Sequence, residues 1–256
     1  ALAASLKAIA AGGFEEFYRG GMARRIVQGV QQAGGLFTEE DMAGYRAEWG
    51  EPVGVDYRGY RVITTPPGSA GFQILQALKL METFGEEELA YMRPDSVHLL
   101  VEAIKLAVVD RIAYGGDPDH VPVPLDALLS EEYALAQKRR IDRRHAALLP
   151  DVRHHANLPD GTLKPGDISG ARGETTHFAV ADRDSNVVTI TQTLGAFYGC
   201  GIAPGDTGIF LNNGCTWVDI EEGGPNPVEG GRRVSFVLAP TQVFRDGEFY
   251  MSLGTT

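Results

Sequence analysis

Cysteine, positive charge and long apolar runs are scarce in this sequence. Its 256 residues include two cysteines, Cys200 and Cys215, whose spacing fits no CxxC metal motif. We expect free thiols, because nothing in the sequence indicates secretion; a disulfide between them is the alternative. On the same ground the cytoplasm is favoured over the periplasm or secretion. No run of eighteen apolar residues occurs, so no membrane segment is expected. The net charge of −11 argues against nucleic-acid binding.

Patterns typical of metal sites are also missing. The six histidines are scattered, and His145 and the pair His154–His155 lie in charged or loop surroundings, where we expect them to face solvent. We interpret GSAG, residues 68–71, as a tight turn before a helix and not as an anion site. The stretch GGDPDHVPVP, residues 115–124, carries carboxylates, which we interpret as part of a solvated loop. The sequence therefore predicts no metal and no other cofactor.

The composition that is present is that of a packed globular protein. Hydrophobic residues make up 43% of the chain and charged residues 22%, which is enough apolar material for a core. The sequence starts without Met and stops on MSLGTT, inside a run that resembles a strand. We therefore expect a piece of a longer chain.

The chain divides into a helical part and a later part rich in strands. Over the first 150 residues we predict helices, with an N-cap at Thr38 and one strand over residues 57–67. Residues 96–116 are apolar enough for a largely buried helix. Residues 158–174 have the composition of a loop. The strands predicted after this loop are HFAVAD, NVVTITQTL, TGIFLNN, RRVSFVLAPTQVF and EFYMSL. This order suggests a layered α/β arrangement.

The first two of these strands form a predicted β-hairpin. HFAVAD and NVVTITQTL are separated by the turn-forming residues RDS. Pairing Asp182 with about Val187 and stepping outward along both strands brings Thr175 or Thr176 opposite Thr193, to within about one residue. The hairpin therefore places the Thr193 hydroxyl next to the start of the strand that Thr175 opens.

A threonine at a new N-terminus would carry its own catalytic base. A threonine hydroxyl is a weak nucleophile near neutral pH, and the free α-amino group of the same residue can act as its base. The pKa of such an amine is about 8, so part of it is neutral at pH 7. Cleavage between Glu174 and Thr175 would therefore supply nucleophile and base together. An ordinary loop entering a strand is the alternative, because threonine suits strands.

The whole chain resembles the gamma-glutamyltranspeptidase family. The similarity lies in ETTHFAVADRDSNVVTITQTL and GCGIAPGDTGIFLNN, and upstream in YRGYRVITTPPGSAGFQILQALKLME and EAIKLAVVDRIAYGGDPDHVPVP. The resemblance implies an α/β fold of the N-terminal nucleophile hydrolase type, a four-layer α-β-β-α sandwich of which this chain is a fragment. It also implies autocatalytic cleavage before Thr175, so that residues 1–174 belong to the large subunit and residues 175–256 to the small subunit.

The same resemblance implies a chemistry and a set of partners. Thr175 matches the family's nucleophile, and Thr193 matches the threonine that hydrogen-bonds it. The expected reaction forms an acyl-enzyme from γ-glutamyl amides. The expected partners are therefore a small-molecule amide substrate and the two subunits of one precursor.

The positions that would hold a glutamyl group depart from the family pattern. Where the family commonly has polar side chains, this sequence has Gly195, Gly214, Trp217, Phe236 and Val237. A site built from hydrogen-bonding groups discriminates by polarity. These five residues therefore predict a larger and more apolar acyl pocket.

Three alternatives remain open from the sequence. A shifted loop alignment, or substitution by Asp219 or Arg232, would restore glutamyl binding. The same fold could instead act on a non-glutamyl amide, in the manner of cephalosporin acylases. An uncleaved, inactive homologue with a binding or structural role is the third. The family's oxyanion-hole glycines and its substrate-binding arginine would lie outside this sequence.

Overall fold

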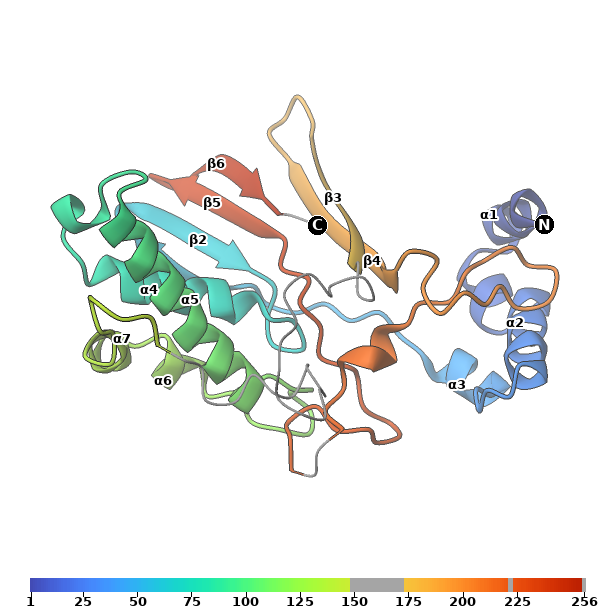
Figure 1. Ribbon diagram of the computed structural model, residues 1–256. Helices are drawn as coiled ribbons and strands as arrows, with labels where there is room; N and C mark the ends of the chain where they lie inside the picture. Colours follow the sequence, from blue (N-terminus) through green and yellow to red (C-terminus); the bar gives the residue numbers. More distant parts are fainter. Residues whose placement is uncertain (148–172, 221–222, 255–256) are drawn as a thin grey trace. The chain divides into compact units, whose positions relative to one another are not determined.

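The computed structural model describes residues 1–147, 173–220 and 223–254. These residues divide into two compact units. The first unit holds Ala1–Trp49, Thr193–Gly214 and the start of one strand up to Thr175, and the second unit holds the rest of the described chain. Helices and antiparallel sheets are both present (Figure 1), so the α/β prediction is confirmed. Most of the loop predicted over residues 158–174 lies outside the described residues, as do His154 and His155.

Three helices build the first unit, and their boundaries follow from local sequence. They are α1 (Leu2–Tyr18), α2 (Gly21–Gln32) and α3 (Glu39–Gly44). α1 kinks at Gly13, where φ is 60°. Thr38 caps α3 as predicted, because its hydroxyl accepts the Asp41 N–H at 3.1 Å and the Asp41 carboxylate accepts the Thr38 N–H at 2.8 Å. The core of this unit is formed by Met22, Ala23, Ile26, Val27 and Met42.

The polypeptide after residue 196 packs against α2 as an irregular loop. A Cβ added at Gly29 would lie 2.5 Å from the backbone nitrogen of Gly205, so helix and loop backbones touch. Ser5, which is buried, donates a hydrogen bond to the carbonyl of Thr207 at 2.7 Å. The strand predicted over residues 207–213 is wrong. Gly208 adopts a φ of 67°, which breaks an extended run. The backbone of Leu211 forms hydrogen bonds with Cys200 and Ile202 of the same loop.

An antiparallel four-stranded sheet forms the centre of the second unit. Its strands follow the order β1-β2-β5-β6 and comprise β1 (Val53–Tyr57), β2 (Tyr60–Thr64), β5 (Thr241–Arg245) and β6 (Glu248–Leu253). Val62 pairs with Val55 on one side and with Val243 on the other. These three side chains form one core cluster with Leu75 of the neighbouring helix. The strand predicted over EFYMSL is thereby confirmed.

Two strand predictions in this sheet need correction. The single strand predicted over residues 57–67 is a hairpin of β1 and β2, because the chain turns at Arg58 and Gly59 with φ values of 50° and 82°. The strand predicted over residues 232–244 is confined to β5. Backbone N–H groups before Pro240 donate instead to Asp117, Asn226 and Gly68, so residues 232–239 form a single bridge at Phe236 and no continuous strand.

Helices cover one face of this sheet (Figure 1). They are α4 (Gly71–Glu82), η1 (Glu86–Leu89), α5 (Pro94–Tyr114), α6 (Leu125–Leu128) and α7 (Glu131–Lys138). α4 follows directly on the predicted turn at GSAG, where Gly68 has a φ of 95°. The prediction that α5 is largely buried is wrong for one side of the helix. Its exposed apolar side chains are Val97, Leu100, Val101 and Ile104, which are 40–44% exposed. α4 contacts the opposite side, through Leu99 and Ala103.

A buried carboxylate links α4, α5 and α7. Asp110 of α5 accepts hydrogen bonds from Gln76, from the Tyr133 hydroxyl at 3.0 Å and from Gln137 Nε2 at 3.0 Å. Burial, together with the neighbouring Asp110 carboxylate, raises the pKa of Tyr133 to about 12. The Tyr133 hydroxyl therefore stays protonated and donates its hydrogen bond across the physiological range. This network fixes the spacing of the three helices.

The predicted hairpin is present as β3 (Gly173–Ala181) and β4 (Val187–Ala196). Within the second unit, side chains connect it to the four-stranded sheet. The Thr189 hydroxyl lies 2.8 Å from that of Ser252 on β6, and Gln242 of β5 donates to the same Thr189 oxygen at 3.0 Å. The hairpin is therefore fixed to β5 and β6 by hydrogen bonds.

Candidate active site

The register of the hairpin pairs Thr175 with Thr193. At the turn, the Asp182 N–H donates to the Asn186 carbonyl at 3.1 Å. Further along, His177 Nδ1 lies 2.8 Å from Thr191 Oγ1. Each step back along one antiparallel strand is matched by one step forward along the other, so both contacts belong to the same register. Two steps beyond His177 and Thr191, that register places Thr175 opposite Thr193.

This pair falls at a position where side chains lie close together. Directly opposed residues in antiparallel strands alternate between hydrogen-bonded pairs and narrower pairs without backbone bonds, with Cα atoms about 4.5 Å apart in the narrower ones. Asp182 and Asn186 are joined by a backbone bond, so Thr175 and Thr193 fall on the narrower kind. Their pairing agrees with the register expected from sequence. The roles of Thr175 as nucleophile, of Glu174–Thr175 as cleavage junction and of Thr193 as its partner stay predictions.

The Thr193 hydroxyl is held by the turn that follows it. Its oxygen accepts the Gly195 N–H at 2.8 Å. Gly195 is buried and has a φ of 90°, a backbone conformation that favours glycine. The end of β4 is also held by Asn213, whose side-chain oxygen accepts the Ala196 N–H at 2.8 Å. The backbone conformation therefore explains glycine at position 195 without reference to the shape of an acyl pocket.

His177 fixes the strand two residues after Thr175. A Cβ added at Gly254 would lie 2.0 Å from His177 Nδ1 and 2.1 Å from its Cε1, so the imidazole rests directly on the Gly254 backbone. The same Nδ1 forms the hydrogen bond to the Thr191 hydroxyl. The ring therefore contacts both β4 and the residue after β6. Sequence reasoning missed Thr191 and Gly254, because neither residue type carries a signal for this role.

Two of the predicted pocket residues line one small cavity. Trp217 and Val237 border a cavity of about 90 Å³ in the second unit. Its other lining residues are Arg111, Ile112, Gly115, Asp219, Asn226 and Ser235. Phe236 does not line this cavity; its backbone pairs with the turn before α4, and its side chain is 37% exposed. Gly214 is the last residue assigned to the first unit and the first residue of the short helix η3 (Gly214–Trp217).

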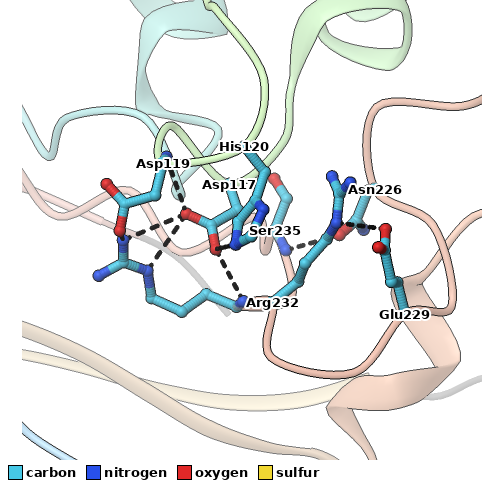
Figure 2. Close-up of polar contacts among 8 residues, drawn as sticks. Asp117, Asp119, His120, Asn226, Glu229, Arg232 and Ser235 are labelled. Atoms are coloured by element: carbon cyan, nitrogen blue, oxygen red, sulfur yellow. Dashed lines mark hydrogen bonds and ion pairs between the residues drawn. The ribbon is translucent and has the colours of Figure 1, made fainter.

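Asn226 joins the walls of this cavity. Its side-chain oxygen accepts the Ser235 N–H at 2.9 Å, and its amide donates to the Trp217 carbonyl at 2.9 Å. The Asn226 N–H donates to Asp219 Oδ2 at 2.9 Å, and the Asp219 N–H donates back to the Asn226 carbonyl. Figure 2 shows Asn226 beside Ser235. Arg232, the other residue considered for glutamyl binding, pairs with Glu229 at 2.6 Å.

The carboxylates of residues 115–124 pair with Arg233, and that of Asp117 is buried. Figure 2 shows Asp117 with Asp119 and His120 on this loop. The Asp117 side chain is 3% exposed and contacts the Arg233 guanidinium at 3.1 Å and the Arg233 N–H at 2.9 Å. The prediction of a solvated loop is therefore wrong for Asp117. Asp119, which is exposed, also pairs with Arg233. A proline- and glycine-rich stretch gave no sign that one of its carboxylates has a partner 116 residues later.

The ion pair sets the charge state of Asp117. Burial alone would raise the pKa of this carboxyl. The backbone N–H groups of Arg233 and Asp119 and the Arg233 guanidinium outweigh burial, so the pKa lies below its usual value. A lowered folded-state pKa adds stability above the unfolded value of about 3.9 and loses it as the pH falls through the folded value.

Asp117→Asn is expected to destabilise the full-length protein by about 2 kcal/mol at pH 7, since it removes the buried negative charge that accepts hydrogen bonds from the Arg233 guanidinium and from backbone N–H groups. Urea unfolding measures this change, with Asp119→Asn as a matched control on the exposed partner of the same arginine. The control should cost less than about 1 kcal/mol. The gap between wild type and Asp117→Asn should narrow below about pH 4. Equal losses for both variants would contradict the assignment.

Metal and membrane features are not found in the described part of the chain. Across residues 1–147, 173–220 and 223–254, no three His, Cys, Asp or Glu side chains converge as metal ligands. Cys200 and Cys215 are both free and exposed. No described helix combines the length and apolar character needed to cross a bilayer.

A family model accounts for the whole sequence. The model described as Gamma-glutamyltranspeptidase matches residues 1–256. The chain belongs to this family. The glutathione hydrolase proenzyme of Escherichia coli is 36% identical over 266 residues, covering 99% of this chain and 44% of the relative. The acylase ACY 1 proenzyme of Pseudomonas sp. strain SE83 is 34% identical, covering 98% of this chain and 43% of the relative.

A solved structure with the fold of the gamma-glutamyltranspeptidase family is also similar to this chain. The crystal structure of cephalosporin acylase from Bacillus halodurans matches with a TM-score of 0.80 and 30% identity, covering 98% of this chain and 42% of the acylase. The predicted gamma-glutamyltranspeptidase family and the predicted N-terminal nucleophile hydrolase fold class are thus confirmed. The chain spans less than half the length of the relatives it matches.

Arg111 is a cavity residue that sequence reasoning also missed. It lies in α5 and lines the same cavity as Trp217, Asp219 and Val237. Burial lowers the pKa of Arg111 below its usual value, and the Asp219 carboxylate partly offsets this effect. A signal was present in the sequence, because Asp110 and Arg111 are the charged residues within the otherwise apolar run LAVVDRIAY.

Proposed function

We propose that the full-length protein is a self-processing amidohydrolase or acyltransferase of the gamma-glutamyltranspeptidase type, with Thr175 as its nucleophile. The observation that carries this proposal is the hairpin register that opposes Thr175 and Thr193. Relatives described as glutathione hydrolase proenzymes support it. A proenzyme is made as one chain and cut, which accords with large and small subunits that meet at Glu174 and Thr175.

Maturation would use the same hydroxyl as turnover. Thr175 Oγ attacks the carbonyl carbon of Glu174, the Glu174–Thr175 amide bond breaks, and the acyl group moves from nitrogen to oxygen as an ester. Water then hydrolyses the ester, which leaves a carboxylate on Glu174 and a free amine and hydroxyl on Thr175. That amine can accept the hydroxyl proton in later cycles.

Turnover follows by acyl transfer. The Thr175 hydroxyl attacks the substrate's amide carbonyl while the α-amine takes its proton. The amine leaving group departs with a proton, and an acyl ester remains on Thr175. Water, or an amine acceptor, then attacks the ester and restores the hydroxyl. Thr193 supports this step because a hydroxyl can accept from the Gly195 N–H and donate to Thr175 at the same time.

A second substrate class has its own support. Trp217 and Val237 line a cavity where glutamyl-binding side chains would be expected, and two acylase relatives align over nearly the whole chain. The second candidate function is therefore an acylase of the same fold and mechanism that acts on a non-glutamyl amide.

Cleavage of the purified full-length protein is the direct test. We expect intact-mass analysis to find two chains and N-terminal sequencing to find one that begins Thr-Thr-His, because the proposed ester forms only at Thr175. Detecting a single chain with no Thr-Thr-His terminus would contradict the enzyme proposal. It would favour an uncleaved homologue with a binding or structural role.

A further inference from the structure

One face of the hairpin carries Thr175, Thr193 and a second pair of side chains beside them. Residues two apart along a strand share a face, and directly opposed residues of two strands point to the same side. His177 and Thr191 are therefore the next cross-strand pair on the face of Thr175 and Thr193. The register makes both pairs of the narrow kind, without backbone hydrogen bonds between the opposed residues. At His177 the side chains therefore supply the link between the two strands.

The His177 imidazole makes two contacts. Its Nδ1 lies 2.8 Å from the Thr191 hydroxyl oxygen. A Cβ added at Gly254 would lie 2.0 Å from the same nitrogen and 2.5 Å from the ring carbon Cγ. Gly254 does not adopt a positive φ, so its backbone conformation does not require glycine. The ring does require it, because a side chain at position 254 would collide with the imidazole.

The same face is anchored to the four-stranded sheet on the side toward the hairpin turn. The Thr189 hydroxyl lies 2.8 Å from that of Ser252 and accepts a hydrogen bond from Gln242 at 3.0 Å. His177 therefore lies between this anchor and Thr175. A reacting group displaced by about 1 Å can lose about 10²-fold in rate. A contact that holds β3 two residues from Thr175 is therefore close enough to control the rate.

We propose that His177 is a positioning residue for Thr175. Its contacts with Thr191 and Gly254 fix β3 against β4 and against the chain after β6, which sets the position of Thr175 two residues earlier in the strand. His177 acts by geometry and exchanges no proton with the reacting groups. The inference rests on the proposed role of Thr175. Self-cleavage and acyl transfer should therefore both slow when either contact of His177 is lost.

His177→Leu and His177→Asn separate the hydrogen bond from the shape of the side chain. Leucine and asparagine are nearly isosteric, but only asparagine places a polar atom where the imidazole has Nδ1. In the full-length precursor, His177→Leu should slow self-cleavage about tenfold or more, and His177→Asn should recover most of the rate. Gel electrophoresis and intact-mass analysis of samples taken over time measure cleavage. Equal rates in the two variants would overturn the role of the hydrogen bond.

The partner hydroxyl gives a second test with a control on the same strand. Thr191→Val should lower the self-cleavage rate, and the kcat of the processed enzyme on phenylacetyl anilide, about tenfold or more. KM should change little, because no substrate-binding group is altered. Thr191→Ser keeps the hydroxyl and should recover both rates. Thr189→Val removes a hydroxyl with two partners from the same face of β4 and should leave both rates unchanged. Equal losses in Thr189→Val and Thr191→Val would reject the proposal.

Gly254→Ala tests the other contact without altering a hydrogen-bonding group. The added methyl group collides with the imidazole, so this variant should also slow self-cleavage. In a His177→Ala background the methyl group meets no ring, so the double variant should be no slower than His177→Ala alone. Additive losses, or wild-type cleavage in Gly254→Ala, would contradict the contact as a means of positioning Thr175.

Thr175→Ala, measured alongside, separates this inference from the proposed function. If Thr175→Ala is cut, the proposed nucleophile fails whatever the other variants show. If Thr175→Ala stays uncut while His177→Leu and Thr191→Val are cut at the wild-type rate, only the positioning role fails. Thermal unfolding of each precursor shows whether a slow variant is folded. Slow cleavage that always accompanies a lowered melting temperature, without recovery in His177→Asn or Thr191→Ser, would leave His177 a purely structural residue and overturn the proposal.

Discussion

Thr175→Ala in the full-length protein is expected to yield one uncut chain and a loss of amide hydrolysis of about 10⁴-fold or more. The variant removes the hydroxyl that both the proposed cleavage and the proposed acyl transfer require, and it leaves the backbone of β3 unchanged. Gel electrophoresis and intact-mass analysis measure cleavage, and release of aniline from acyl anilides measures turnover.

Two matched variants give this experiment its controls. Thr175→Ser keeps a hydroxyl at the same position and should restore part of both activities. Thr176→Ala makes the same chemical change at the next residue, whose exposed side chain points to the other face of the strand, and it should be cleaved. A Thr175→Ala protein that is cut and active would exclude Thr175 as the nucleophile.

The second large expected effect concerns the acyl group. By the family pattern, Gly195, Gly214, Trp217, Phe236 and Val237 replace polar groups that would hold a glutamyl head group, and Trp217 and Val237 line one cavity. Each lost charge-assisted hydrogen bond weakens binding by roughly 1.5–3 kcal/mol. Two such losses lower kcat/KM by about 10²-fold to 10⁴-fold. We therefore expect poor activity on γ-glutamyl anilide and better activity on a bulkier or more apolar acyl amide.

Steady-state kinetics on the processed full-length enzyme measure this preference. The comparison uses one leaving group throughout, so that differences in kcat/KM report the acyl side alone. A kcat/KM for γ-glutamyl anilide well above that of every apolar acyl anilide would reject the prediction. Asp219, Arg232 or residues beyond this sequence would then be the groups that hold the glutamyl head group.

The sequence predicted local structure best where one residue type decided it. Thr38 correctly predicted the start of α3. The short RDS connection between two alternating runs set the hairpin register to within about one residue, with Thr175 or Thr176 opposite Thr193, and the structure selects Thr175. Both depend on neighbours along the chain. The predicted strand over residues 207–213 was wrong because Gly208 turns the backbone and α2 offers a surface for an irregular loop.

Contacts between residues far apart in the sequence could not be predicted from local sequence patterns. Asp117 looked like a loop carboxylate, and only the fold shows that Arg233 buries it. Trp217 and Val237 were identified from the family pattern, but their meeting with Arg111 in one cavity depends on how α5 packs beside the later loops. A pattern of residue types records the local backbone preference and carries little information about such long-range contacts.

The pairing of β2 with β5 would have a different consequence if the chain is cut before Thr175, as proposed. β2 precedes the junction and β5 follows it. In the same way Asp117 precedes the junction and its partner Arg233 follows it. A sheet that forms within one molecule would then be shared by two polypeptides. Unfolding would become dissociation, so the midpoint of denaturation would rise with protein concentration. Refolding would be a second-order encounter of two fragments, and the uncut precursor would be the only form that assembles this sheet in a single-molecule step.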